Sequence, residues 1–236
     1  MSFFISLGII VLAMVVILFL QLRPGVFMLF SHYTRGKFSR ARASDLSIFF
    51  ILGAEAASSC IFLCSYYLAN LFFLYAFRPE TSFFAWVAVG VLIALAIASI
   101  FCYFRPGPGT RLFISRASAR ALDTHARGAK SRSDAFILGA ISGMCELVFA
   151  LPLYIIASVE LIELSVTPAP AYLLMLLFII APILPLFVIR WRFASRHNLA
   201  ELQRSRVHSK SFIRILLPVC YLTIAILIIY FRITAS

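Results

Sequence analysis

Residues 44–60 read SDLSIFFILGAEAASSC, and residues 133–145 read SDAFILGAISGMC. Both stretches leave a basic loop at Ser-Asp and enter an apolar segment through Phe-Ile-Leu-Gly-Ala, and an Arg-Pro-Gly sequence precedes each loop. Ser-Asp is a favourable helix start, because the hydroxyl accepts a hydrogen bond from a free N–H group and the carboxylate lies at the positive end of the helix dipole. The sequence therefore predicts two related helices, each entered from a basic loop.

The composition is that of a membrane protein. Of 236 residues, 63% are hydrophobic, whereas soluble domains are roughly 45–50% apolar. Nineteen of the 21 Lys and Arg residues fall in three stretches, 22–45, 105–133 and 190–214. Basic loops on the cytoplasmic side of a membrane explain this placement better than nucleic-acid binding, so no nucleic-acid partner is expected.

Six apolar segments divide the chain, and a bilayer core of about 30 Å needs about 20 helical residues. The segments cover about residues 3–21, 46–77, 82–104, 135–164, 171–189 and 212–231. We therefore expect an all-α polytopic membrane protein with six transmembrane helices, arranged as repeated two-helix hairpins. Residues 1–236 then form a single integral membrane domain.

The basic loops predict the orientation of these helices. With six spans, loops 22–45, 105–133 and 190–211 all lie on one side. The positive-inside rule makes that side cytoplasmic and places both termini outside. Five or seven spans would place at least one basic loop on the opposite side. The expected location is the cell (inner) membrane.

Small residues and prolines predict how the helices pack. Two stripes of mostly small residues recur at helical spacing, which lets membrane helices approach closely. The first comprises Gly53, Ala56, Ala57, Cys60 and Cys64, and the second comprises Gly139, Ser142, Gly143, Glu146 and Ala150. Proline interrupts helical hydrogen bonding, so Pro152 is expected to bend segment 135–164, whose Glu160 and Glu163 lie at its outer end. Pro182 and Pro185 are expected to break segment 171–189.

Two acidic residues are predicted near the membrane midplane. Glu55 lies ten residues beyond Asp45, and Glu146 lies twelve beyond Asp134, which at 1.5 Å per residue is about 15–18 Å. An acidic residue in a span costs roughly 2.5–3.5 kcal/mol even on the lenient insertion scale. Such a residue usually faces the protein interior or a water-filled cavity.

These acids predict an ion- or substrate-binding site. The candidate ligands are Glu55, Glu146, Ser58, Ser59 and Ser142, because carboxylate and hydroxyl oxygens bind protons and hard cations. The alternative is a pair of neutral, hydrogen-bonded acids with a structural role. The prolines of the later segments favour the first interpretation, since broken helices free carbonyl groups for ligands.

Two cysteines support a different interpretation. Cys60 and Cys145 follow the repeated glycines at offsets of seven and six. Residues 145–154, CELVFALPLY, resemble the Cys-plus-proline segment of membrane thiol-disulfide carriers of the CcdA/DsbD type, which use one Cys in each of two related helices. The resemblance implies a redox pair formed by Cys60 and Cys145. Otherwise the cysteines are apolar packing residues.

The loops predict partners at the membrane surface. In loop 105–133, Arg116, Arg120 and Arg127 are spaced to meet anionic lipid headgroups from a surface helix, or else belong to a solvated loop. The sequence contains no Walker A, GxGxxG, nucleophile-elbow or zinc-binding motif. No catalytic residue, metal or cofactor is therefore predicted.

Together these features favour a small secondary transporter or ion-coupled permease that uses intramembrane carboxylates to move a small solute or cation. The first alternative is a non-catalytic membrane subunit or assembly factor with a membrane-protein partner. The second alternative is the thiol-disulfide carrier. The sequence does not identify a substrate.

Overall fold

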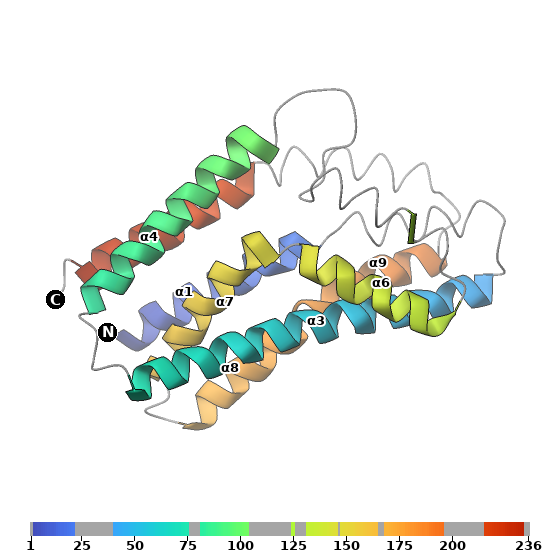
Figure 1. Ribbon diagram of the computed structural model, residues 1–236, viewed down its shortest axis with the longest axis horizontal. Coiled ribbons are helices and arrows are strands. Elements are labelled where there is room, and N and C mark those ends of the chain that lie inside the picture. Colours follow the sequence, from blue (N-terminus) through green and yellow to red (C-terminus); the bar gives the residue numbers. More distant parts are fainter. Residues whose placement is uncertain are drawn as a thin grey trace.

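The computed structural model describes residues 2–21, 40–75, 81–103, 124–125, 131–145, 147–164, 168–195 and 215–233, and these are almost entirely helical, with no strand among them. In chain order the elements are α1 (Ser2–Gln21), α3 (Arg40–Tyr75), α4 (Thr81–Ala98) with the π-helical turn η2 (Ser99–Tyr103), α6 (Arg132–Cys145), α7 (Leu147–Leu164), α8 (Pro168–Ile180), α9 (Ile183–Ser195), and a last helix over 215–228 followed by the π-helical turn η3 (Ile229–Ile233) (Figure 1).

Four stretches of these helices are long and apolar enough to cross a membrane. They are Ser44–Phe72, Phe84–Phe101, Leu147–Leu164 and Ala171–Val188. Two shorter apolar helices, Phe4–Leu18 and Ile215–Phe231, fall on the first and last predicted segments. The predicted all-α class with membrane-spanning helices is confirmed at this level, whereas the six-span hairpin arrangement and its orientation stay predictions.

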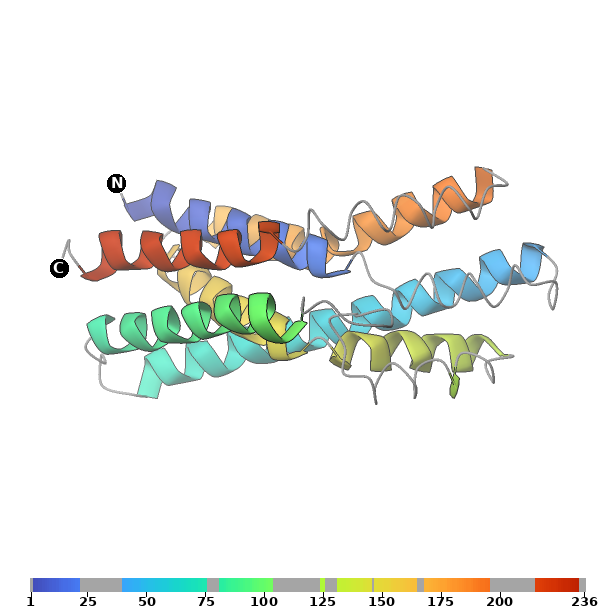
Figure 2. The ribbon, with the colours of Figure 1, turned by 90° about the horizontal axis from the view of Figure 1, so that it is seen from above.

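The helices run between two ends of the molecule. Figures 1 and 2 show both chain termini at one end, and the starts of α3 and α6 together with the end of α9 at the opposite end. With 36 residues, α3 is the longest helix described, and at 1.5 Å per residue it is about 54 Å long. It therefore extends from one end of the molecule to the other. It joins the helices near the termini to those at the opposite end.

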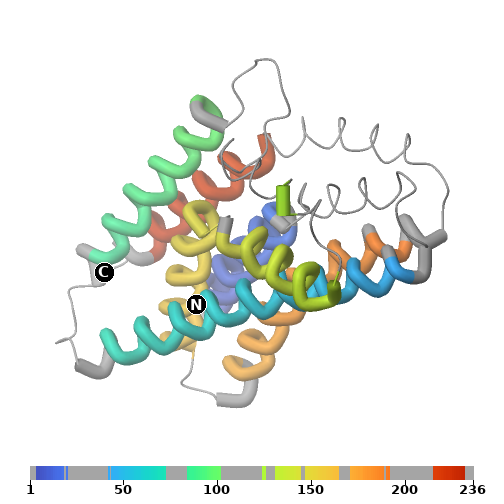
Figure 3. The backbone as a smooth tube through the Cα atoms, turned by 45° about the vertical axis from the view of Figure 1, so that its right-hand side comes forward, coloured from blue at the N-terminus to red at the C-terminus, as the bar shows by residue number. Residues whose placement is uncertain are grey.

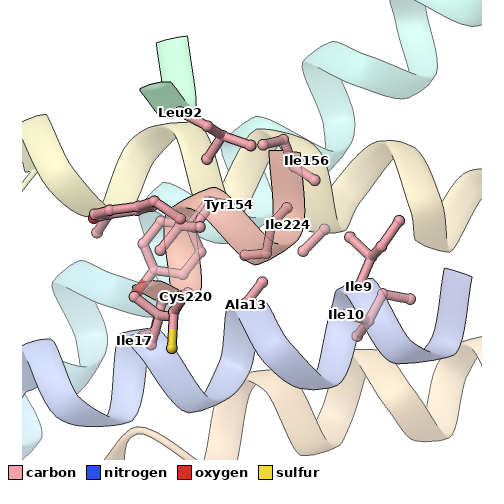
Figure 4. Close-up of a cluster of buried hydrophobic side chains, with 14 of the residues drawn as sticks. Ile9, Ile10, Ala13, Ile17, Leu92, Tyr154, Ile156, Cys220 and Ile224 are labelled. Atoms are coloured by element: carbon pink, nitrogen blue, oxygen red, sulfur yellow. The ribbon is translucent and has the colours of Figure 1, made fainter. Parts of the chain in front are cut away.

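The apolar core joins α1, α4, α7 and the last helix. Figure 4 shows Ala13 and Ile17 of α1, Leu92 of α4 and Ile224 of the last helix in one buried cluster with Tyr154 of α7. Within a bilayer the surrounding lipid is as apolar as these side chains, so close van der Waals packing holds such helices together. The core therefore places α7 at the centre of the helix group near the termini.

Predicted segment 135–164 changes direction between α6 and α7, and the expected bend at Pro152 stays a prediction. α6 ends at Cys145 and α7 begins at Leu147, and Figure 3 shows that the two helices run in different directions. Pro152 lies inside α7. Its ring nitrogen cannot donate to the Val148 carbonyl. The neighbouring carbonyl, that of Phe149, accepts a hydrogen bond from the Tyr221 hydroxyl at 3.2 Å, so the last helix braces α7 beside the proline.

Predicted segment 171–189 is broken at one of its two prolines. A turn at residues 181–182 separates α8 from α9, and the Leu184 amide donates to the Ala181 carbonyl at 3.1 Å. Pro185 lies within α9 instead of breaking it. The expected break at Pro182 is thus confirmed, and the expected break at Pro185 is wrong because a proline in the first turn of a helix replaces an amide that needs no helical partner.

Candidate functional site

The two related sequence stretches pack against each other backbone to backbone. A Cβ atom added at Gly53 would collide with the Phe136 carbonyl oxygen, and one added at Gly139 would collide with the Phe50 carbonyl oxygen. Each glycine therefore faces the residue that lies three positions before the other glycine. The contact is reciprocal, and α3 and α6 cross in the same direction along their Phe-Ile-Leu-Gly repeats. Only glycine allows helix backbones to approach this closely.

The contact face of α3 is rotated from the predicted stripe. It contains Gly53, Ala54 and Ala57, and a Cβ atom at Gly143 would lie 2.9 Å from the Ala57 methyl group and 3.3 Å from the Ala54 carbonyl oxygen. Ala56, Cys60 and Cys64 are exposed, so their predicted place in the contact is wrong. The reason is length: α6 ends two residues after Gly143, and α3 continues past it.

Charged and polar groups join α3, α6 and α9 at the end of the molecule opposite the termini. Arg132 Nε donates to Asp45 Oδ2 at 2.7 Å, and its guanidinium lies 5.3 Å from the centre of the Phe49 ring. Arg190 Nη2 donates to Ser44 Oγ at 2.9 Å. These residues stand at the edges of the three basic stretches of the sequence. Their contacts therefore bring the ends of those stretches together.

The two predicted helix starts are displaced along the chain. In α6 the Asp134 amide donates to Ser131 Oγ at 3.1 Å, and the Ser131 amide donates to Asp134 Oδ2 at 3.0 Å. This reciprocal pair is a capping box, which moves the cap from Ser133 to Ser131. In the first copy, α3 begins at Arg40, before the predicted cap at Ser44. Asp45 is instead available to pair with Arg132.

Glu55 lies in the middle of α3 and inside the candidate span Ser44–Phe72. Only 7% of its surface is exposed. Ser59, one helical turn later, donates from Oγ to Glu55 Oε1 at 3.0 Å, and Ser58 is buried beside it. Residues three and four apart share a helix face, so Glu55 and Ser58 lie on the same face of α3 as the buried ring of Phe62.

That face of α3 meets α7 and α8 through aromatic rings. The Phe62 ring stacks on Phe178 of α8 with centroids 4.7 Å apart, and it lies 5.9 Å from the ring of Tyr154 of α7. Tyr154 and Phe178 also meet edge to face at 5.9 Å. We call Phe62, Tyr154 and Phe178 the aromatic cluster. Glu55 therefore lies on the inner side of α3 and not on its exposed side.

Ser142 of α6 is completely buried. It precedes Gly143, which packs against Ala54 and Ala57 of α3. The candidate residues Glu55, Ser58 and Ser142 thus belong to two helix segments in direct contact. Glu55 and Ser58 lie on the buried face of α3, and Ser142 lies on the helix that crosses α3.

Several predicted residues cannot be placed at this site. Glu146, Arg116, Arg120 and Arg127 lie outside the described residues, as does the side chain of Cys145. Cys60 is exposed on α3, and its pairing with Cys145 stays a prediction. Among the described residues, no group of three or more His, Cys, Asp or Glu side chains is placed to hold a metal ion.

Glu160 of α7 is a buried acid that the sequence did not single out. It lies near the end of its helix, as expected, but only 4% of its surface is exposed. Glu163, three residues later, is half-buried. The signal available in the sequence was the apolar run on both sides of Glu160, from Tyr154 to Leu164.

Comparisons of the chain with protein-family models, with curated proteins and with solved structures found no match. The chemistry of the buried polar groups is therefore the guide to function.

Proposed function

We propose that the protein is a small secondary transporter or ion-coupled permease in which Glu55 binds the coupling proton or cation. The observation that carries the proposal is the burial of Glu55 inside a candidate membrane span, with the Ser59 hydroxyl 3.0 Å from its carboxyl oxygen. An acid at this depth costs a few kcal/mol of insertion free energy. A role in ion coupling accounts for keeping an acid where an apolar residue would be more stable.

The neighbouring hydroxyl groups suit the same role. Ser58 and Ser59 flank Glu55 on α3, and the buried Ser142 stands on the helix that crosses α3 at this level. Carboxylate and hydroxyl oxygens bind protons and hard monovalent cations without a dedicated metal cage. Glu146 remains a proposed second acid of the site.

Broken helices give further support. One long apolar segment changes direction between α6 and α7, and a second is interrupted by the turn at residues 181–182 between α8 and α9. Interrupted helices free backbone carbonyl groups at membrane depth, and secondary transporters build substrate and ion sites from them. Phe178, near the end of α8, belongs to the aromatic cluster beside Phe62. The second interruption therefore lies close to the helix face that carries Glu55.

The proposed orientation places the basic loops 22–45, 105–133 and 190–211 in the cytoplasm and both termini outside. It is supported by the contacts of Asp45 with Arg132 and of Ser44 with Arg190, which gather the edges of these loops at one end of the molecule. Arg116, Arg120 and Arg127 then face the anionic headgroups of the inner leaflet, each charge contributing about 1 kcal/mol of binding.

Reconstitution into liposomes tests the proposal. Small solutes are added one class at a time, and enclosed dyes report movement of protons and of Na⁺. We expect one solute class to drive ion movement through the wild type and through the control Glu163→Gln, and Glu55→Gln to abolish it. Undiminished movement through Glu55→Gln would reject the role of Glu55. A co-purifying membrane protein whose binding tolerates Glu55→Gln would favour the alternative, a non-catalytic subunit.

A further inference from the structure

The buried acid of α7 resembles Glu55 in its burial within a candidate membrane span. Glu160 lies inside the candidate span Leu147–Leu164, and its neighbours Ala157 and Leu161 are almost fully buried. Ser158, two residues before it, is completely buried and donates from Oγ to the Tyr154 carbonyl at 2.7 Å. Ser158 is two residues from Glu160 and therefore projects from another face of α7. What Glu160 shares with Glu55 is burial inside a candidate membrane span.

The aromatic cluster separates the two acids along the molecule. Glu55 precedes Phe62 by seven residues, which is about 10 Å along α3, and Glu160 follows Tyr154 by six residues, which is about 9 Å along α7. Phe62 and Tyr154 are in contact at 5.9 Å. Both helices run towards the end of the molecule that carries the chain termini (Figures 1 and 2). Glu55 and Glu160 therefore lie on opposite sides of the cluster.

The cluster has the character of a barrier to ions. Phe62 and Phe178 are almost completely buried and stack on each other, and Tyr154 packs against both rings. Apolar constrictions in membrane proteins block ions by excluding water. On a route from Glu55 to Glu160, these rings would have to separate before an ion could pass.

We infer that Glu160 is a second proton- or monovalent-cation-binding site on the route through Glu55, and that the aromatic cluster of Phe62, Tyr154 and Phe178 is the gate between the two sites. This inference rests on the proposed function, because it gives the ion bound at Glu55 a second binding site, nearer the end of the molecule that carries the chain termini. A single carboxylate balances one positive charge, which favours a proton or a monovalent ion over a divalent one.

Carbodiimide labelling of the full-length protein in liposomes tests the site without requiring a substrate. The carboxylic O–H of a protonated acid adds across a C=N bond of dicyclohexylcarbodiimide, and the adduct rearranges to a stable N-acylurea. This apolar reagent favours acids in apolar surroundings. Mass spectrometry of peptides then compares Glu160 with Glu163 on the same helix. We expect several-fold more labelling at Glu160, whereas equal or weaker labelling there would overturn the inference.

The gate is tested by proton entry into the same liposomes under an imposed membrane potential. Phe62→Ala is expected to create a proton leak that Glu160→Gln and Glu55→Gln each remove and that the control Glu163→Gln preserves. A leak that Glu55→Gln removes and Glu160→Gln preserves would overturn this inference and leave the proposed function standing. If Phe62→Ala does not fold, the labelling comparison still decides the site, because it uses the wild-type chain.

Discussion

α3 makes two different contacts along its length. Near its start it crosses α6 with glycine backbones touching carbonyl oxygens, so that no side chain separates the helices at Gly53 and Gly139. Further on it meets α7 and α8 through the aromatic cluster and carries Glu55 on the face between. A backbone contact has one geometry and tolerates no added atom, whereas rings change rotamer and slide. We therefore expect the α3–α6 crossing to hold its geometry and the aromatic contact to be the one that adjusts.

The largest expected effect comes from adding a methyl group to the crossing. Gly139→Ala puts a Cβ atom onto the Phe50 carbonyl oxygen, and we expect it to destabilise the protein by about 4 kcal/mol or more. The matched control is Gly90→Ala on α4, where a Cβ atom meets nothing within 4 Å. There the substitution removes the helix penalty of glycine and stabilises by about 0.5–1 kcal/mol. Unfolding in detergent by added denaturing surfactant measures both, and equal effects would refute the tight crossing.

A smaller effect is expected in the aromatic cluster. Phe62→Ala removes an almost completely buried ring that contacts two helices, and the expected loss of stability is about 3 kcal/mol. Phe72→Ala is the control, because this ring is 44% exposed and meets the ring of Phe84 edge to face. We expect less than about 1.5 kcal/mol there. A loss at Phe72 as large as that at Phe62 would show that the cluster is not a distinct packing centre.

The brace beside Pro152 should contribute less again. Tyr221→Phe removes the hydroxyl that donates to the Phe149 carbonyl, and the expected cost is about 1 kcal/mol, typical of one hydrogen bond. Tyr67→Phe on the exposed face of α3 serves as the control and should change the unfolding midpoint very little. If both variants have the same unfolding midpoint as the wild type, the hydrogen bond from the last helix does not stabilise α7.

The smallest effect is expected at the ion pair of Asp45 and Arg132. The two side chains are 38% and 67% exposed, and exposed pairs contribute about 0–1 kcal/mol. A double-mutant cycle of Asp45→Asn and Arg132→Gln isolates the pair from its other contacts. The coupling should shrink further at high salt because mobile ions screen it. A coupling energy above about 2 kcal/mol that resists salt would mean that the pair is buried in the membrane-bound protein.

The positions of the apolar segments could be predicted because a run of about 20 apolar residues is a signal contained in one stretch of sequence. The small residues around Gly53 and around Gly139 likewise predicted that each helix makes a close contact, but not that the two helices contact each other. The side of α3 that meets α6 could not be predicted from the sequence, because it depends on where α6 ends. Cys60 lies outside the contact because α6 ends two residues after Gly143 while α3 continues.

The rest of the site depended on contacts between distant residues. The burial of Glu160 follows from the helices that surround α7, and its distance from the helix end carries no such information. The change of direction between α6 and α7 has no proline beside it to predict it from the sequence. The hydrogen bond from Arg190 to Ser44 joins residues 146 positions apart. No local sequence pattern predicts such a contact.

The most direct test of the central claim, that Glu55 binds the coupling ion, is a thermal-shift measurement on the purified protein with Na⁺, K⁺, Li⁺ and a series of pH values. A ligand that binds the folded state at 100 times its Kd stabilises it by about 2.7 kcal/mol. We predict that one of these ions raises the Tm of the wild type and of Glu163→Gln but leaves Glu55→Gln unchanged. An equal rise in Tm for Glu55→Gln would contradict the claim.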